Sequence, residues 1–322
     1  MGISPSRPAA PGPGDEPGFT PCPARGRVYA TSRTVRAGDV TPSGRLRLDA
    51  FARYLQEAAE DDVADTGWQA PYDWMLRRCA VSARGYPALG DPVTLRTFCT
   101  GTGPRWAERT TTLAGQAGEL MQATAIWVAI GPAGEPSELG PDFHRLYGAA
   151  TAGRRIRARL TLPAPGPAAD DRPWPVRASD FDPADHVNNT VHWQAAEETL
   201  ARLEWLPVAA ELEYHRPILP GATPRLLISQ AVGQVLFWLV NGQERLASGR
   251  LCQLPAAGWY DDLPDCLRQA QAVLAGRHRG GDGVSLVLVR ARGHVVHPER
   301  GQSLPRPGRA APGPSPAAPS SP

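Results

Sequence analysis

An acidic side chain and an imidazole, Asp182 and His186, stand four residues apart, directly before the asparagine pair Asn188 and Asn189. A carboxylate beside an imidazole can take a proton from water or attack a carbonyl carbon itself. Asparagine is a preferred residue at a helix start, where backbone N–H groups and the positive end of the dipole can hold an oxyanion. The segment predicts a hydrolytic site, with Asp182 as base or nucleophile and His186 assisting. The alternative is that Asp182 only caps a turn.

The chain contains an internal repeat. Residues 35–42 (VRAGDVTP) align with residues 176–183 (VRASDFDP) at a constant offset of 141. Asp39 and Asp180 are common to both copies, and a residue that both copies need is better explained by structure than by catalysis. Each copy is therefore expected to form the same unit around its own aspartate.

The candidate acid and imidazole occur in the second copy only, because Thr41 and Arg45 stand at the matching places in the first. This asymmetry predicts one working site for the pair of copies. Glu198 lies in a predicted helix of the second copy, but Glu57 occupies the matching place in the first. We therefore expect Glu198 to support the site from behind rather than to act on the substrate.

Each copy combines a helix with several strands. One helix per copy is predicted from apolar residues at helical spacing, namely Ala52, Leu55 and Ala59, then Trp193, Ala196 and Leu200. Strands are predicted at residues 93–99, 106–113 and 120–130, then at 225–232, 235–240 and 244–254. An Asn-Gly pair at 241–242 gives a strong hairpin signal. The pattern predicts an α+β fold in which two units, each a long helix wrapped by an antiparallel sheet, form a fused pseudo-dimer.

The composition excludes several classes of function. The 34 basic residues are all arginine and face 32 acidic ones, a net charge of +2 that creates no field demanding nucleic acid or a membrane surface. Without lysine there is no Schiff-base, P-loop or kinase lysine. The sequence contains no G-x-S-x-G, which argues against an α/β-hydrolase. His186 and His192 are six residues apart and would not share a helix face as two metal ligands would, so a metal is not expected.

Two further features concern the compartment and the ends of the chain. Five scattered cysteines form no C-x-x-C pair, and no apolar run reaches the roughly 18 residues of a membrane span, which favours a cytoplasmic protein. Residues 1–27 and 257–322 are rich in Pro, Gly and Ala, and both are expected to be disordered, apart from a short strand near 284–289. Residues 149–173 are expected to form a linker.

Four motifs in order carry a resemblance to a known family: YPALGDPV at 86–93, ATAIWV at 123–128, HVNN at 186–189 and LEYHR at 212–216. They resemble those of the acyl-ACP thioesterases of plants and bacteria, whose members carry two hotdog domains in one chain. The resemblance implies a tandem double hotdog, with an N-terminal domain at 28–148 that holds the acyl pocket and a catalytic domain at 174–256. It also implies a cofactor-independent enzyme that releases a free fatty acid from its partner, acyl carrier protein; a homodimer is left open.

The chain departs from the plant pattern at three positions. Ala184 replaces an asparagine of the catalytic motif, and Pro217 and Ile218 replace a glutamate and a cysteine. The remaining pair, Asp182 with His186, resembles the single-aspartate scheme of the 4-hydroxybenzoyl-CoA thioesterases. Two alternatives therefore stay open: an acyl-CoA thioesterase and a non-catalytic acyl-binding module.

Overall fold

A computed structural model describes residues 19–166, 170–203, 205–231 and 233–253; the whole predicted tail, 257–322, with the strand expected near 284–289, lies outside these residues. The strands are β1 (Val28–Thr34), β2 (Asp73–Ala83), β3 (Pro92–Thr102), β4 (Trp106–Gly115), β5 (Gly118–Ile130), β6 (Asp170–Pro173), β7 (Ala209–Tyr214), β8 (Arg225–Ala231), β9 (Gln234–Asn241) and β10 (Glu244–Cys252). The helices are α1 (Leu48–Thr66), α2 (Gly140–Tyr147) and α3 (His192–Leu200), with the 3-10 turns η1 (Ala37–Asp39), η2 (Gly148–Thr151) and η3 (Ala178–Asp180). Within this part of the chain, no helix is both long and apolar enough to cross a membrane.

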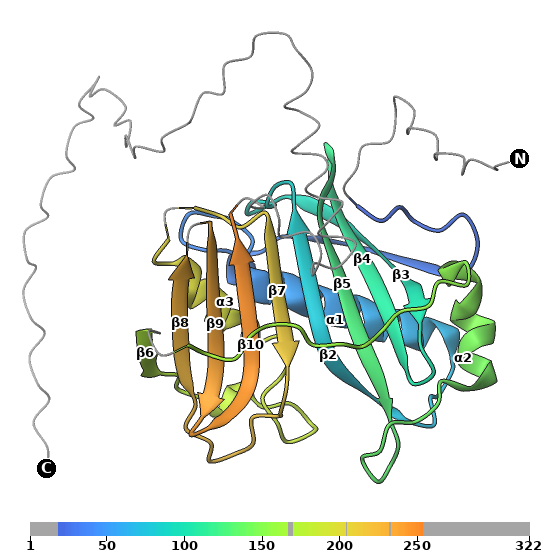
Figure 1. Cartoon of the computed structure of the whole chain (residues 1–322). Helices are drawn as coiled ribbons and strands as arrows, with labels where there is room; N and C mark the ends of the chain where they lie inside the picture. Colours follow the sequence, from blue (N-terminus) through green and yellow to red (C-terminus); the bar gives the residue numbers. More distant parts are fainter. Residues whose placement is uncertain (1–18, 167–169, 204, 232, 254–322) are drawn as a thin grey trace, which may run out of the picture. The chain divides into compact units, whose positions relative to one another are not determined.

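The strands form one antiparallel sheet in the order β1-β3-β4-β5-β2-β7-β10-β9-β8-β6, and α1 and α3 lie against the same face of it (Figure 1). Strands β1 to β5 correspond in turn to strands β6 to β10. The two halves of the sheet therefore have the same strand order, counted from the central β2–β7 pair outward. The two halves meet where β2 pairs with β7, from Arg78 opposite Glu213 to Ser82 opposite Ala209. The internal repeat of the sequence is therefore a repeat of the fold.

The structure differs from the sequence prediction in three respects. The two central strands, β2 and β7, were not predicted, because they carry charged residues such as Arg78, Glu211 and Glu213 on the face away from the helices. Strand β6 pairs with β8 inside the segment expected to be a linker. The second helix, α3, has nine residues against nineteen in α1.

The larger of the two apolar clusters among the described residues lies between α1, α3 and the sheet. Buried side chains of both halves contribute to it, among them Phe51 and Tyr54 from α1, Trp193 from α3, and Leu95 and Leu239 from the sheet. Burying a large apolar side chain stabilises the folded state by about 1.5–3 kcal/mol. Because the core is continuous across β2 and β7, the two halves are expected to unfold together.

The end of the predicted leader is ordered on the sheet. Thr20 N donates to Gln122 Oε1 (2.8 Å), Gln122 Nε2 donates to Thr20 O (2.9 Å), and the guanidinium of Arg84 stacks on the buried ring of Phe19. The prediction of disorder is therefore wrong for residues 19–27. The buried ring of Phe19 supplies an apolar contact that anchors this segment.

The segment at 152–163 crosses the face of the sheet opposite the helices (Figure 1). Trp106 Nε1 donates to Ile156 O (2.9 Å), and Trp238 Nε1 donates to Pro163 O (2.8 Å). Leu162 N donates to the carboxylate of Glu213 (3.1 Å), whose pKa burial raises. This segment shields the charged outer side chains of the central strands, which explains how such residues are buried inside a sheet.

Candidate active site

Asp182 and His186 lie on a tight turn between η3 and α3. Asp182 N donates to His186 O (3.0 Å), and Asp185 N donates to Asp182 O (3.0 Å). Asp185 adopts a left-handed conformation (φ 58°), which a residue with a side chain adopts at some cost. Ala184 N donates to Asp182 Oδ1 (3.0 Å), so the carboxylate does cap the turn, as the alternative reading required.

The turn also brings the acid and the imidazole together. His186 Nδ1 lies 3.4 Å from Asp182 Oδ1, and their side chains are 32% and 17% exposed. The other carboxylate oxygen, Oδ2, receives a long hydrogen bond from Asn188 Nδ2 (3.4 Å). A partly shielded carboxylate oriented by an amide and beside an imidazole can accept a proton from a water molecule in the open part of the turn.

The predicted helix start consists of a turn followed by the helix. Asn188 Oδ1 accepts hydrogen bonds from Thr190 N (2.9 Å) and Thr190 Oγ1 (2.8 Å), and α3 begins at His192. Tyr214 Oη donates to Asn189 O (3.1 Å). Asn188 therefore closes the turn that precedes α3, whereas the N-cap position of the helix is Val191, which makes no side-chain cap hydrogen bond; both ends of the Asn188 side chain are engaged. An oxyanion held here would have to use backbone N–H groups.

His192 lies buried directly beneath this turn. Its Nδ1–H donates to Asn188 O (3.3 Å), and its ring meets Tyr214 edge-on at 5.2 Å. Burial, with a smaller contribution from His186, lowers the pKa of His192 to about 4. His192 is thus a neutral donor that holds the backbone of the site. Among the described residues, no group of three or more His, Cys, Asp or Glu side chains could hold a metal ion.

The first copy forms the same turn with other side chains. Thr41 N donates to Arg45 O (2.8 Å), Gly44 N donates to Thr41 O (2.8 Å), and Gly44 (φ 84°) takes the left-handed place of Asp185. Arg45 forms a two-pronged ion pair with Glu197 of α3, at 3.1 and 2.5 Å. This turn is therefore tied to the helix of the other copy.

Glu197 also caps the first-copy helix. Its Oε1 accepts a hydrogen bond from Leu48 N (2.6 Å), the first residue of α1, and the side chains of Glu197 and Arg45 are each 12% exposed. Glu198, the predicted supporting residue, lies exposed on α3, and its role stays a prediction. The sequence analysis missed Glu197; in the repeat, a glutamine, Gln56, stands at the matching place.

The two shared aspartates have the structural role that their repetition predicted. Asp39 accepts hydrogen bonds from Arg36 N (2.9 Å) and Tyr54 Oη (2.6 Å), and Asp180 accepts one from Arg177 N (2.8 Å). Burial alone would raise the pKa of Asp39, but these hydrogen bonds and nearby arginines lower it below the usual value. Both carboxylates stabilise the 3-10 turn that precedes each site.

Glu213, His215 and Ser248 form a second grouping of catalytic residue types, on the outer face of the sheet. His215 Nε2 lies 3.0 Å from Ser248 Oγ and 3.8 Å from Glu213 Oε2. In a catalytic triad, one ring nitrogen of the histidine contacts the hydroxyl and the other contacts the carboxylate. Here the Ser248 hydroxyl and the Glu213 carboxylate both lie nearest the same nitrogen, Nε2. Ser248 is also fully buried, so this grouping is structural.

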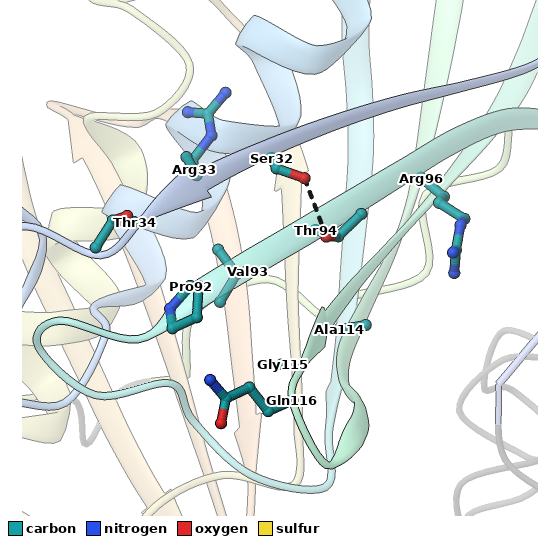
Figure 2. A pocket seen from close by; sticks show the side chains of 10 residues that line it. All are labelled: Ser32, Arg33, Thr34, Pro92, Val93, Thr94, Arg96, Ala114, Gly115 and Gln116. Atoms are coloured by element: carbon teal, nitrogen blue, oxygen red, sulfur yellow. Dashed lines mark hydrogen bonds between the residues drawn. The ribbon is translucent and has the colours of Figure 1, made fainter.

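Two surface hollows lie away from the Asp182 turn. The first, of about 520 Å³, lies along β1, β3 and the β4–β5 turn, where Arg33 and Arg96 flank a hydrogen bond between Ser32 and Thr94 (Figure 2). The second, of about 540 Å³, is lined by residues that include Arg45, Tyr86 and Leu206. Neither is lined by Asp182 or His186, and the acyl pocket remains a prediction.

The sequence and the fold both resemble those of known thioesterases. Residues 26–135 match the family model of the acyl-ACP thioesterase N-terminal domain. An uncharacterized protein of Mycobacterium tuberculosis is 29% identical over 236 residues, which cover 72% of this chain and 94% of that relative.

Two solved structures share the fold. A protein of Lactobacillus plantarum assigned as an oleoyl thioesterase gives a TM-score of 0.62 at 19% identity, covering 72% of this chain and 99% of its own. The 12:0-ACP thioesterase of Umbellularia californica gives 0.61 at 20% identity, covering 71% and 98%. The resemblance predicted from the motifs is thereby confirmed: residues 26–135 match the N-terminal domain model of the acyl-ACP thioesterases, and the fold is that of the hotdog-like structural neighbours.

Proposed function

We propose that this chain hydrolyses the thioester of an acyl-acyl carrier protein to a free fatty acid and the free carrier thiol, as part of fatty acid synthesis. The family match at residues 26–135 supports the reaction class. The single observation that carries the site is the 3.4 Å approach of His186 Nδ1 to Asp182 Oδ1 on an accessible turn. No cofactor enters the mechanism.

In the proposed mechanism, Asp182 is the general base. Its carboxylate takes one proton from a water molecule, whose oxygen forms a bond to the thioester carbon. Backbone N–H groups of the turn that leads into α3, near Asn189, hold the negative carbonyl oxygen of the tetrahedral intermediate. The C–S bond then breaks, and the proton held by Asp182 returns to the leaving thiolate. His186 assists by orienting the carboxylate.

We assign the two halves as a tandem double hotdog, with domains at 28–148 and 174–256. The mirrored strand order and the two equivalent turns support this assignment. In this scheme the first domain holds the acyl chain and the second carries out the chemistry.

The departures from the plant pattern are compatible with a single-aspartate mechanism. Ala184 lies exposed in the turn, where only its backbone N–H contacts Asp182. Ile218 is buried, and its carbonyl accepts a hydrogen bond from Val187 N (2.9 Å). The position of the plant cysteine is thus part of the core here. Burial also raises the pKa of Cys99 and Cys252 to about 11, which makes both poor nucleophiles.

The test is turnover of an acyl-acyl carrier protein and of the matching acyl-CoA, measured side by side. The proposal expects hydrolysis of both, with the higher kcat/KM on the carrier protein. A preference for acyl-CoA would favour the first alternative. Acyl binding without hydrolysis of either substrate would favour the second, a non-catalytic module.

A further inference from the structure

Gln56 on α1 is the counterpart of Glu197 on α3. The two residues are separated by the same offset of 141 that separates Arg45 from His186 and Leu48 from Asn189. The offset is structural as well as sequential, because the hydrogen bonds of the turns at Thr41 and Asp182 match one for one. What Glu197 contacts in the first copy therefore predicts what Gln56 faces in the second.

In the first copy, Glu197 reaches across to the opposite unit. It pairs with Arg45 on the turn and accepts a hydrogen bond from Leu48 N at the helix start. The strand order of the sheet has the matching symmetry about the β2–β7 pair. Exchanging the two copies places the side chain of Gln56 beside His186 and the backbone N–H of Asn189.

The state of the Gln56 side chain supports this placement. Its Nε2 donates to Glu60 Oε1 (3.0 Å), whereas Oε1 is buried and has no hydrogen-bond partner among the described residues. A buried acceptor left without a donor destabilises the folded state. The reaction proposed above brings a donor to this place, namely the attacking water.

We infer that Gln56 completes the Asp182 site from the other half of the molecule, by accepting a hydrogen bond from the attacking water. The inference rests on the proposed function. The water gives one proton to the Asp182 carboxylate and donates its other hydrogen to Gln56 Oε1. These two hydrogen bonds orient a lone pair of the water oxygen toward the thioester carbon. A neutral amide is required, because a carboxylate here would occupy the helix start, as Glu197 does in the first copy.

The kinetic test compares two variants with a matched control. Gln56→Leu should lower kcat about 10- to 100-fold while KM changes less than about twofold, since the lost contact is to water and not to the thioester. Gln56→Glu should lower kcat further. Gln243→Glu, which makes the same charge change on the exposed β9–β10 turn, should match the wild type. A rise in KM with unchanged kcat, or wild-type kinetics for both Gln56 variants, would overturn the role.

A second measurement does not depend on activity. Titration of the His186 ring followed by NMR should move upward by about one pH unit in Gln56→Glu, because a nearby carboxylate favours the imidazolium. Asp182, which lies beside this ring, and His192, which interacts with it electrostatically, are unchanged in the variant. An unshifted His186 titration would show that Gln56 lies elsewhere. A wild type that hydrolyses neither thioester would sink the proposed function and the water role with it, while the titration still decides the placement.

Discussion

The two turns share a backbone and differ in their side chains. At residues 41–45 and 182–186 the same two backbone hydrogen bonds close the same loop, and each follows a buried aspartate on a 3-10 turn. In the first copy the turn ends in Arg45, which is paired with Glu197; in the second it ends in His186, which lies beside Asp182. The repeated residues build the turn, and the residues that differ give it chemistry.

The difference also separates a closed site from an open one. In the first copy, Leu48 N at the start of α1 donates a hydrogen bond to the carboxylate of Glu197. This free N–H group at the positive end of α1 therefore already has a partner within the protein. We infer the opposite for the second copy, where the matching side chain is the neutral Gln56. A fused pair with one closed and one open site can specialise, with one half binding the acyl chain and the other cleaving it.

The largest expected effect comes from removing the acid of the open site. Asp182→Asn should lower turnover by about 10²–10⁴-fold, the usual range for loss of a positioned base, and leave the melting temperature close to that of the wild type. The amide oxygen can still accept the hydrogen bond from Ala184 N that closes the turn.

Thr41→Asn is the matched control for this change, because it puts the same amide on the equivalent turn of the first copy. It should leave turnover unchanged. Equal losses from the two variants would mean that the turns matter only for folding, and that Asp182 is not the base.

The repeat and the motifs were enough to predict the pairing of helices with sheets and the turn that carries Asp182 and His186. They could not predict β2 and β7, because their outer charges are buried only by a segment distant in sequence, 152–163. They also missed Glu197, whose partners Arg45 and Leu48 are about 150 residues away. Contacts between the copies are long-range, and a local pattern does not contain them.

The next effect concerns His192, whose place in the first copy is taken by Phe51. The pKa of His192 is about 4 in the folded state and 6.5 ordinarily, so the unfolded chain binds more protons between these values. The free energy of unfolding is therefore unaffected by this ring above about pH 6.5. As the pH falls from 6.5 toward 4, it decreases by about 3 kcal/mol, because the unfolded chain takes up a proton that the folded protein does not.

His192→Phe makes the second copy like the first and should flatten that loss, as measured by urea unfolding at pH 7, 5.5 and 4.5. Part of the acid sensitivity should remain, because burial, with nearby arginines, also lowers the pKa of His215 to about 4. If the variant loses stability with pH as steeply as the wild type, His192 does not titrate within the folded state.

A smaller effect is expected from breaking the Arg45–Glu197 ion pair that closes the site of the first copy. Glu197→Gln removes the charge that pairs with the largely buried Arg45 but keeps an acceptor for Leu48 N, and this change should lower the free energy of unfolding by about 1–3 kcal/mol. Turnover at a temperature where the variant is folded should stay near that of the wild type. A loss of turnover comparable to that of Asp182→Asn would show that the site of the first copy is also catalytic.

The smallest expected effect is on the length of the acyl chain that the enzyme prefers. Ala52 on α1 is buried in the core, and Trp193 takes the matching place in the second copy, so the first half has a small residue where the second has a large one. If the space beside Ala52 belongs to the acyl pocket, Ala52→Phe should shorten the preferred acyl chain. Each methylene that no longer fits should lose about 0.8 kcal/mol of binding free energy. If Ala52 packs only against its own sheet, the same change should cost about 1–3 kcal/mol of stability and leave the preference unaltered. The chain lengths of the released acids, measured together with the melting temperature, distinguish these outcomes: an unaltered product profile in a destabilised protein would make the first half a scaffold and not a pocket.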